Sequence, residues 1–202
     1  ERAGEVDRDH RVPVEVAGHQ AVQPFVREQL GVALLREHRV ELESSVAATK
    51  TFIASLAALL SLVAAWSDET SLEAALNRLP GRLAEATHLD WSRAVDAMSC
   101  ANSLVTLGRG PTLAIAQEAA LKLKEVCNLH AEAYSGAEFQ HGPTALVSKN
   151  YPVLVFMPND EAAPNLAKVA ADISRKGGLV FVTGTDDALA GALPVLPADH
   201  PE

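Results

Sequence analysis

The sequence predicts an α/β fold, a three-layer sandwich in which a parallel β-sheet lies between two layers of helices, preceded by a helical connector. Three short apolar runs predict the strands: residues 103–107, 153–157 and 179–183. Helix-like segments separate these runs, and fully apolar strands that alternate with helices indicate a flavodoxin-like parallel sheet covered on both faces. In such sheets ligands bind beyond the carboxyl ends of the strands, where the sequences GRGP, MPND and GTDD follow the three runs.

By composition the chain divides into three parts. Residues 1–42 carry scattered charges and two prolines without a sustained periodic pattern, so this segment remains unassigned. Residues 43–90 are rich in helix formers and are expected to form the helical connector. Residues 91–202 contain the alternating strands and helices and are expected to form the α/β domain.

The connector contains the most apolar stretch of the chain, residues 51–66. Sixteen residues are fewer than the roughly 20 that a membrane-spanning helix needs, so we expect a helix buried on most sides and no contact with a membrane. Residues 67–86 then predict an N-cap cluster and two short amphipathic helices, separated by Pro80 and Gly81.

Within the α/β domain, residues 90–101 predict a helix and residues 103–107 the first strand. Gly108, Arg109 and Gly110 then form a tight turn, and Pro111 opens a helix at the position where a missing N–H costs least. Downstream we expect a helix over 161–175, the strand at 179–183 and a possible last strand at 193–196.

Composition excludes some classes of function. The 202 residues have a formal net charge of -9, which argues against nucleic-acid binding because that requires clustered Lys and Arg. Cys100 and Cys127 lie in apolar helix-like segments without a CxxC spacing, so we expect buried free thiols. Free thiols fit a reducing compartment, and residues 1–16 contain no apolar core of a signal peptide, so a cytoplasmic location is expected.

The turn GRGP could present backbone N–H groups and a helix N-terminus to a phosphate, with Arg109 adding a charge-assisted contact. It has neither the spacing of a Walker loop nor a dinucleotide-binding fingerprint. The alternative is a tight turn with a surface arginine.

The following helix carries Glu118, Lys122 and Glu125 at spacings of four and three residues. At these spacings the side chains are neighbours on a helix surface, so Lys122 is expected to pair with both carboxylates. One interpretation is a solvated charged stripe; the other is that Glu125 is a general base held close to a cation.

The segment HAEAYSGAEFQHGP, residues 130–143, is too polar for a core and too rich in proton-handling groups for an idle linker. Glu138 and His141 are three residues apart, on the same side of a helical turn, and His141 suits acid or base chemistry at neutral pH. A metal site is the alternative, but the sequence has no HExxH pair or companion cysteine, so neither a metal nor another cofactor is expected.

Four segments together resemble the sugar isomerase (SIS) domain family. They are similar to the isomerase half of glucosamine-6-phosphate synthases, which are glutamine–fructose-6-phosphate aminotransferases, and to SIS-type glucosamine-6-phosphate deaminases. The resemblance covers residues 43–202, and the segments that carry it are residues 45–52, 107–110, 118–147 and 175–182.

The resemblance implies ring opening of a hexose 6-phosphate followed by proton transfer between C1 and C2. It implies that Glu125 is the base, that His141 helps to open the ring and that Lys122 is the basic residue beside the base. It also places the backbone of Val46 against the sugar. Ala48 stands where the synthase has Ser, and Gln140 where it has Lys. With these residues we group Ala48, Gly108, Arg109, Gly110 and Glu138 as candidate substrate-binding positions.

We therefore expect an aminosugar-phosphate isomerase or deaminase acting on glucosamine 6-phosphate or fructose 6-phosphate. Glutamine hydrolysis is not expected, because both cysteines are internal. The family's first lobe, final helix and tail lysine have no counterpart in the sequence. A homodimer, or a partner that supplies the missing lobe, is therefore expected. The alternatives are a sugar-phosphate-binding module without catalysis and an inactive fragment of a two-lobe enzyme.

Overall fold

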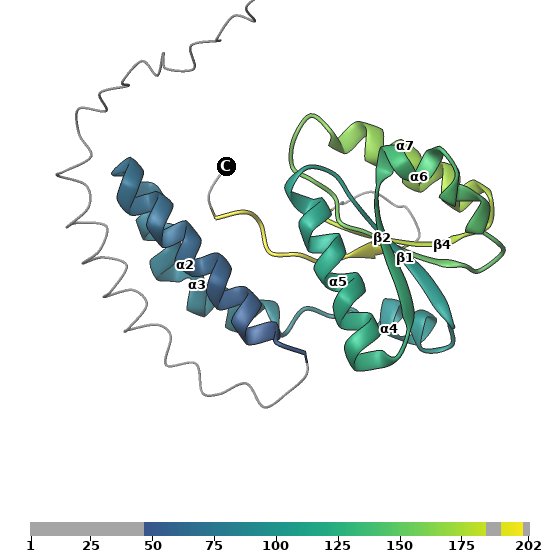
Figure 1. Cartoon of the computed structure of the whole chain (residues 1–202), viewed down its shortest axis with the longest axis horizontal. Helices are drawn as coiled ribbons and strands as arrows, with labels where there is room; N and C mark the ends of the chain where they lie inside the picture. Colours follow the sequence, from purple (N-terminus) through teal and green to yellow (C-terminus); the bar gives the residue numbers. More distant parts are fainter. Residues whose placement is uncertain (1–46, 185–190, 200–202) are drawn as a thin grey trace, which may run out of the picture.

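The structure, a computed structural model, describes residues 47–184 and 191–199 (Figure 1). The unassigned residues 1–42 lie outside the described part of the chain. The described residues form one parallel sheet with helices on both faces and a pair of helices beside it. The predicted fold class is therefore confirmed.

The sheet has five strands in the order β2-β1-β3-β4-β5, and every neighbouring pair is parallel. This is the flavodoxin-like order of doubly wound folds. The strands are β1 (Ser103–Gly108), β2 (His130–Ser135), β3 (Pro152–Val155), β4 (Leu179–Thr183) and β5 (Ala192–Leu193). Three of the predicted strands are present in β1, β3 and β4, and the predicted last strand is shorter and begins one residue earlier.

Helices cover the two faces of the sheet. On one face α4 (Ser92–Ser99) and α5 (Pro111–Cys127) pack on side chains such as Leu104, Leu154 and Phe181. On the other, α6 (Gly136–Gln140), the 3-10 turn η1 (Pro143–Leu146) and α7 (Ala163–Arg175) adjoin a larger core, and Leu166, Val169 and Ile173 of α7 are buried there. Alternate residues of each central strand thus enter opposite cores, which explains their continuous apolar sequence.

The connector is a hairpin of two helices, α2 (Thr49–Ser67) and α3 (Thr70–Ala86). The expectation of two short helices around Pro80 is wrong, because α3 runs through Pro80 and Gly81 without interruption. Proline removes one helical hydrogen bond, and the packing of α3 along α2 offsets that loss. A salt bridge of 2.9 Å between Arg78 Nε and Asp199 Oδ2 joins α3 to the end of the described chain.

Helix α2 is not buried on most sides, which corrects the second expectation for the connector. Ala64 is its only buried residue, and Leu59 and Trp66 are 60% and 74% exposed. The helix has 19 residues and a mean hydropathy of 1.5 over 18 of them, so by length and composition it could cross a membrane. Its apolar character therefore reflects a surface that the described residues leave uncovered.

The two cysteines are free thiols, as expected, but both are exposed, so their predicted burial is wrong. Cys100 is the residue that ends α4, and Cys127 is the last residue of α5. Both lie at helix ends, where the chain leaves the cover of the sheet.

The turn after β1 requires its glycines. A Cβ on Gly108 would lie 2.3 Å from the carbonyl oxygen of Thr112, because α5 begins directly against the end of β1. Gly110 has a φ of +56° and a ψ of -132°, a conformation that side-chain-bearing residues rarely adopt. The close approach places the N-terminus of α5 at the carboxyl end of the sheet.

A capping box begins α6. Ser135 Oγ donates to Glu138 Oε2 at 2.7 Å and accepts from the Glu138 backbone N–H at 3.2 Å, while the Ser135 N–H donates to Glu138 Oε2 at 3.3 Å. These bonds satisfy N–H groups that the short helix cannot pair within itself. The Ser135 hydroxyl and backbone N–H lower the pKa of Glu138, and the charge of Arg109 lowers it further.

Replacing Gly108 by Ala should destabilise the fold by about 1–3 kcal/mol, because the new methyl group collides with the backbone of Thr112. Urea unfolding of both forms measures the difference. Gly81→Ala is the matched control: a Cβ there meets nothing within 4 Å, and alanine in a helix is favoured by about 0.5–1 kcal/mol. Equal stability of Gly108→Ala and the native chain would contradict the close approach.

Replacing Ser135 by Ala should raise the pKa of Glu138 toward its ordinary value, because the hydroxyl that lowers it is removed. A carboxyl whose pKa is lower in the folded than in the unfolded state stabilises the fold at pH values above its unfolded-state pKa. This stabilisation is lost as the pH falls through the folded-state pKa. The melting temperature of the variant should therefore fall more at pH 7 than at about pH 3. Ser148→Ala, at an exposed serine, is the control, and a pH-independent deficit in Ser135→Ala would refute the linkage.

Candidate functional site

Lys122 on α5 lies between two carboxylates. Its Nζ donates a hydrogen bond of 2.8 Å to Glu125 Oε2 and lies 3.3 Å from Glu118 Oε1. Both predicted ion pairs are present. The three side chains are 19–25% exposed, while Glu125 taken with its backbone is an exposed residue, so the cluster lies at the protein surface with partial shielding from solvent.

The electrostatics of this cluster hold Lys122 in its charged form. The hydrogen bond with Glu125 raises the pKa of Lys122, partial desolvation opposes the shift, and Glu118 adds to it. Glu118 Oε1 is buried and, although it is close to Nζ, accepts no well-aligned hydrogen bond within the described residues. The Lys122 ammonium group thus lies close to two carboxylates. Of the two oxygens of Glu125, only Oε2 accepts its hydrogen bond.

A second group of predicted residues lies at the carboxyl edge of the sheet. Gly108 at the end of β1 pairs with Ser135 at the end of β2, which brings the turn formed by Gly108, Arg109 and Gly110 beside α6. The Arg109 backbone N–H donates to Thr112 Oγ1 at 3.0 Å, so the turn is closed by its own helix.

Two carboxylates, those of Glu138 and Asp160, lie near the turn at Gly108–Gly110. Glu138 is held by the capping box and lies within electrostatic range of Arg109. Asp160 Oδ2 is 3.8 Å from the position that a Cβ on Gly110 would take. Two negative groups beside the turn weaken its attraction for a phosphate, so its geometry fits a structural turn at least as well as an anion site.

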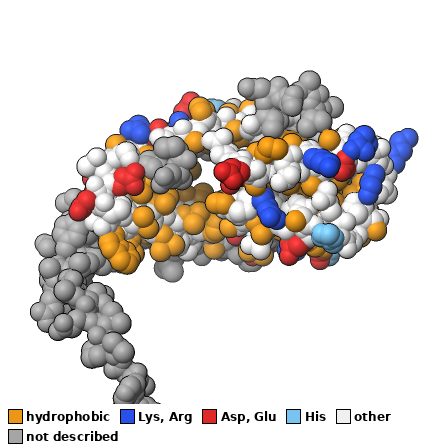
Figure 2. Space-filling view, turned by 90° about the horizontal axis from the view of Figure 1, so that it is seen from above, with side chains coloured by type: hydrophobic (Ala, Val, Ile, Leu, Met, Phe, Trp, Pro, Cys, Tyr) orange, Lys and Arg blue, Asp and Glu red, His pale blue; other side chains and the backbone are white. Residues whose placement is uncertain are grey.

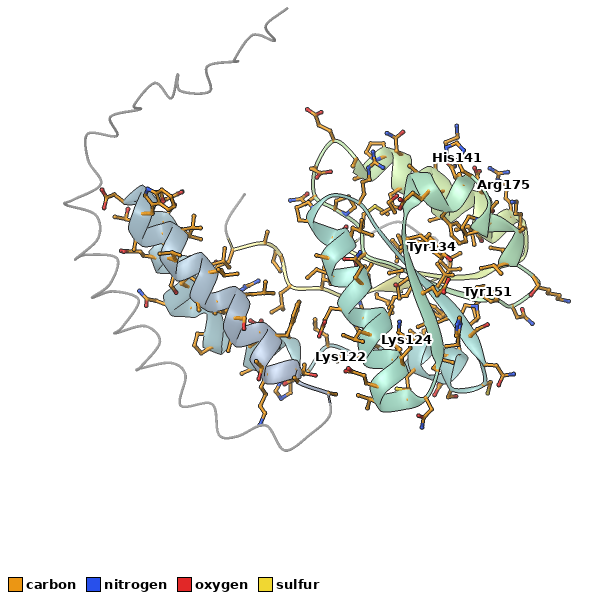
Figure 3. The ribbon with its side chains drawn as sticks, viewed as in Figure 1. Lys122, Lys124, Tyr134, His141, Tyr151 and Arg175 are labelled. Atoms are coloured by element: carbon orange, nitrogen blue, oxygen red, sulfur yellow. The ribbon has the colours of Figure 1, made fainter. Side chains whose placement is uncertain are left out.

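His141 lies at the end of α6, where its backbone N–H donates to the Glu138 carbonyl oxygen at 3.0 Å and its side chain is exposed. α5 starts at this carboxyl edge and runs back across the sheet, so Glu125 lies 14 residues, or about 21 Å, from the start of the helix. Figure 3 shows Lys122 and His141 at opposite ends of the domain. His141 therefore does not meet the other two predicted catalytic residues, Glu125 and Lys122, within one chain.

The connector places one more predicted residue. Ala48 precedes the first turn of α2 and is exposed. In the view of Figures 1 and 3 this end of α2 lies on the side of the domain that carries Lys122, away from His141. Val46 lies outside the described residues.

A wide, open groove of about 560 Å³ runs between α5 and the edge strand β2. Its lining residues are Gln117, Ala120, Leu121, Lys124, Glu132, Ala133 and Tyr134, none of which was predicted as a site residue. Tyr134 Oη donates to a Glu132 carboxylate oxygen, and this bond together with desolvation raises the pKa of Tyr134. The alternation of larger and smaller residues in HAEAYS, residues 130–135, is typical of a strand and could have predicted β2 and the placement of Glu132 and Tyr134 on one face.

No group of three or more His, Cys, Asp or Glu side chains that could hold a metal occurs among residues 47–184 and 191–199. The Glu118, Lys122 and Glu125 cluster carries side chains that can take part in acid, base and electrostatic chemistry.

Comparison with known proteins gives a consistent result. Residues 97–190 match the SIS domain family. Glutamine–fructose-6-phosphate aminotransferase [isomerizing] of Yersinia pseudotuberculosis is 37% identical over 174 residues, which are 78% of this chain and 29% of that protein. The chain thus spans less than a third of the length of this relative.

Among solved structures, a protein of Silicibacter pomeroyi DSS-3 described as a phosphosugar isomerase is 48% identical, with a TM-score of 0.69 over 75% of this chain and 46% of that one. Glucosamine-6-phosphate deaminase of Thermotoga maritima, at 23% identity, shares the fold with a TM-score of 0.58 over 71% of this chain and 44% of that one. The chain contains an SIS domain and is homologous to the isomerase domain of glutamine–fructose-6-phosphate aminotransferase.

Proposed function

We propose that this chain supplies the catalytic base of an enzyme that isomerises hexose 6-phosphates, with glucosamine 6-phosphate and fructose 6-phosphate as its substrates. The observation that carries the proposal is the ion pair of Glu125 and Lys122, joined at 2.8 Å. It is supported by the 37% identity to a protein named as an isomerizing aminotransferase of fructose 6-phosphate.

The proposed chemistry is a proton transfer between adjacent carbons of the open-chain sugar. Glu125 removes a proton from C2 of the aldose, the electrons of that bond form the C1–C2 double bond, and O1 takes up a proton, which gives the enediol or enolamine. The same carboxyl then returns its proton to C1 while the C2 hydroxyl or amine loses one, which gives the ketose or ketimine. A carboxylate suits this step because it can take and return one proton. Lys122, held positive beside it, stabilises the negative charge that develops on the sugar oxygen.

With an amino sugar, the same proton transfer allows deamination. Moving the C2 proton of open-chain glucosamine 6-phosphate to C1, with one proton passing from the C2 amine to O1, gives the ketimine, and water then hydrolyses the ketimine to fructose 6-phosphate and ammonia. Run in reverse, the same steps use free ammonia. No group beyond the sugar, water and a proton carrier is needed for the balance.

Ring opening is the role that we propose for His141, acting from a second copy of the chain. Because His141 and the Glu125 cluster lie at opposite edges of the sheet, one copy cannot apply both to the same hexose. Two copies related by a two-fold axis could combine the Glu125 end of one with the His141 end of the other.

The second candidate is a sugar-phosphate-binding domain that lacks turnover on its own. It is favoured by the separation of Glu125 from His141 and by the 46% share of the Silicibacter pomeroyi chain that this chain covers. Thermal unfolding with and without each sugar phosphate separates the candidates when combined with the assay below. A rise in melting temperature without any product would favour binding alone.

Glu125→Gln should reduce conversion of glucosamine 6-phosphate to fructose 6-phosphate and ammonia by about 10²-fold or more, because the amide cannot accept the proton. The two products are followed together in coupled assays on the full chain. Its melting temperature should stay close to that of the native protein, since the carboxylate of Glu125 pairs with Lys122 at the protein surface and does not support the core.

Glu161→Gln is the matched control, because Glu161 is an exposed carboxylate in the turn before α7, and it should keep full turnover. Turnover retained in Glu125→Gln would rule out Glu125 as the base. A native chain that binds neither sugar phosphate and forms no product would defeat the proposed function as a whole.

Mixing Glu125→Gln with His141→Gln tests the sharing of the site between copies. Each variant alone should be inactive, whereas random exchange of subunits should restore about a quarter of native turnover, because half of the dimers are mixed and one of their two sites is intact. The variants are mixed after partial unfolding and refolded together. If the mixture stays as inactive as its components, His141 does not act across copies.

A further inference from the structure

The exposed face of α2 carries a regular stripe of large apolar side chains. Ile53, Leu56, Leu60 and Val63, here named the α2 seam, are 37%, 40%, 44% and 50% exposed. Leu59 and Trp66 flank the seam and are more exposed still. Figure 2 shows hydrophobic side chains gathered over the part of the molecule that the hairpin occupies.

The spacing within the seam is three, four and three residues. This is the spacing of the core positions of a coiled coil, where two helices interlock side chain by side chain. A helix face that only contacts lipid or an irregular apolar surface would not require its apolar residues to follow this spacing. The seam therefore has the geometry of a helix-binding surface.

The hairpin does not enclose a core of its own. No residue of α3 is buried, and in α2 only Ala64 is. Two helices in contact shield one face of each, whereas two such hairpins placed together can surround a common core as a four-helix bundle. The hairpin thus resembles one half of such a bundle.

The charges at the ends of α2 identify the orientation of the second helix. Lys50 lies in the first turn, Asp68 follows the last, and no charged residue occurs between them. In an antiparallel pair of identical helices Lys50 approaches Asp68 of the second copy at both ends, and the helix dipoles oppose each other favourably. A parallel pair would place like charges together at both ends.

From these observations we propose that the α2 seam binds the α2 seam of a second copy in antiparallel orientation, so that two α2–α3 hairpins form a four-helix bundle. The antiparallel register places Leu56 of one copy opposite Leu60 of the other. A bilayer is the less favourable occupant. α3 follows α2 after two residues and carries Glu73, Arg78 and Arg82, which could not accompany α2 into hydrocarbon.

The first experiment measures the mass of the full chain in solution by light scattering after gel filtration. We expect the native protein to be a dimer and Leu56→Glu/Leu60→Glu to have half its mass, because the paired copies would bury four carboxylates without partners. Val95→Glu on α4 is the matched control. Val95 is 57% exposed but lies outside the seam, so that variant should remain a dimer. Circular dichroism verifies that each variant is folded.

The second experiment tests the orientation and does not depend on the glutamate variants folding. In a Cys100→Ser/Cys127→Ser background, which removes both exposed thiols, Leu56→Cys and Leu60→Cys are made separately. After subunit exchange and mild oxidation, the antiparallel pair should form a disulfide between the two different variants and little within either alone. Disulfides within each variant alone would indicate a parallel pair and overturn the proposal.

The other possible occupants appear as distinct results. A monomeric native chain that co-sediments with phosphatidylcholine vesicles, and loses this in Leu56→Glu/Leu60→Glu, would assign the seam to a membrane. A monomer that does not bind vesicles would leave a different polypeptide, such as the other half of a two-lobe protein, as the occupant. Both results overturn the proposal. Neither the mass measurement nor the disulfide test depends on catalysis. A dimer without turnover would therefore support the seam proposal and count only against the proposed function.

Discussion

The crossover from β1 through α5 to β2 determines where every candidate catalytic group lies. α5 starts against the end of β1, where Gly108 allows its backbone to approach, and the buried Thr106 hydroxyl donates to the Ala116 carbonyl oxygen at 2.8 Å. Ala116 and Ala120 then bring the helix close to the sheet along its length. Because β2 is parallel to β1, α5 must run back along the length of the strands. It therefore carries Glu125 toward their amino ends, whereas His141 follows the carboxyl end of β2.

The charge cluster on α5 is built so that its groups depend on one another. Glu118 and Glu125 are both paired with Lys122, so the cluster as a whole carries one excess negative charge. Ile115 and Val126, on the same helix, are exposed apolar residues. A ligand or second chain that covers this face would lower the local dielectric and strengthen both ion pairs.

The sequence predicted the central part of the fold because physical constraints act locally there. The strands β1, β3 and β4 are covered on both sides and must be apolar, and Leu179–Thr183 was predicted with its observed bounds. β2 was missed because an edge strand can carry Glu132 and Tyr134 without burying them fully. The exposure of α2 and of both cysteines could not be inferred, since apolar composition shows that a surface needs cover but does not show what covers it.

The same distinction applies to the candidate site. The pairing of Lys122 with Glu118 and Glu125 follows from helical spacing alone, so it was predicted from residue numbers. The capping box of Ser135 and Glu138 also follows from local sequence, because a serine three residues before a glutamate is typical of a helix start, and Glu138 stays a candidate substrate-binding residue. The separation of Glu125 from His141 arises because the parallel strand β2 lies between them in the sequence and carries the chain from one end of the sheet to the other. The sequence pattern did not predict this strand.

Two features of the chain are incomplete in the same sense. The candidate base Glu125 and the candidate ring-opening residue His141 lie at opposite ends of the strands, and the α2–α3 hairpin divides its apolar surface between α3 and solvent. A helix of 19 residues gains most of its stability from packing and not from its own hydrogen bonds. A second copy is what each of the two proposals calls for: one to cover the seam, the other to bring a His141 to Glu125. If one two-fold axis relates both contacts, the cohesion of the hairpin and the completeness of the site would depend on one association equilibrium.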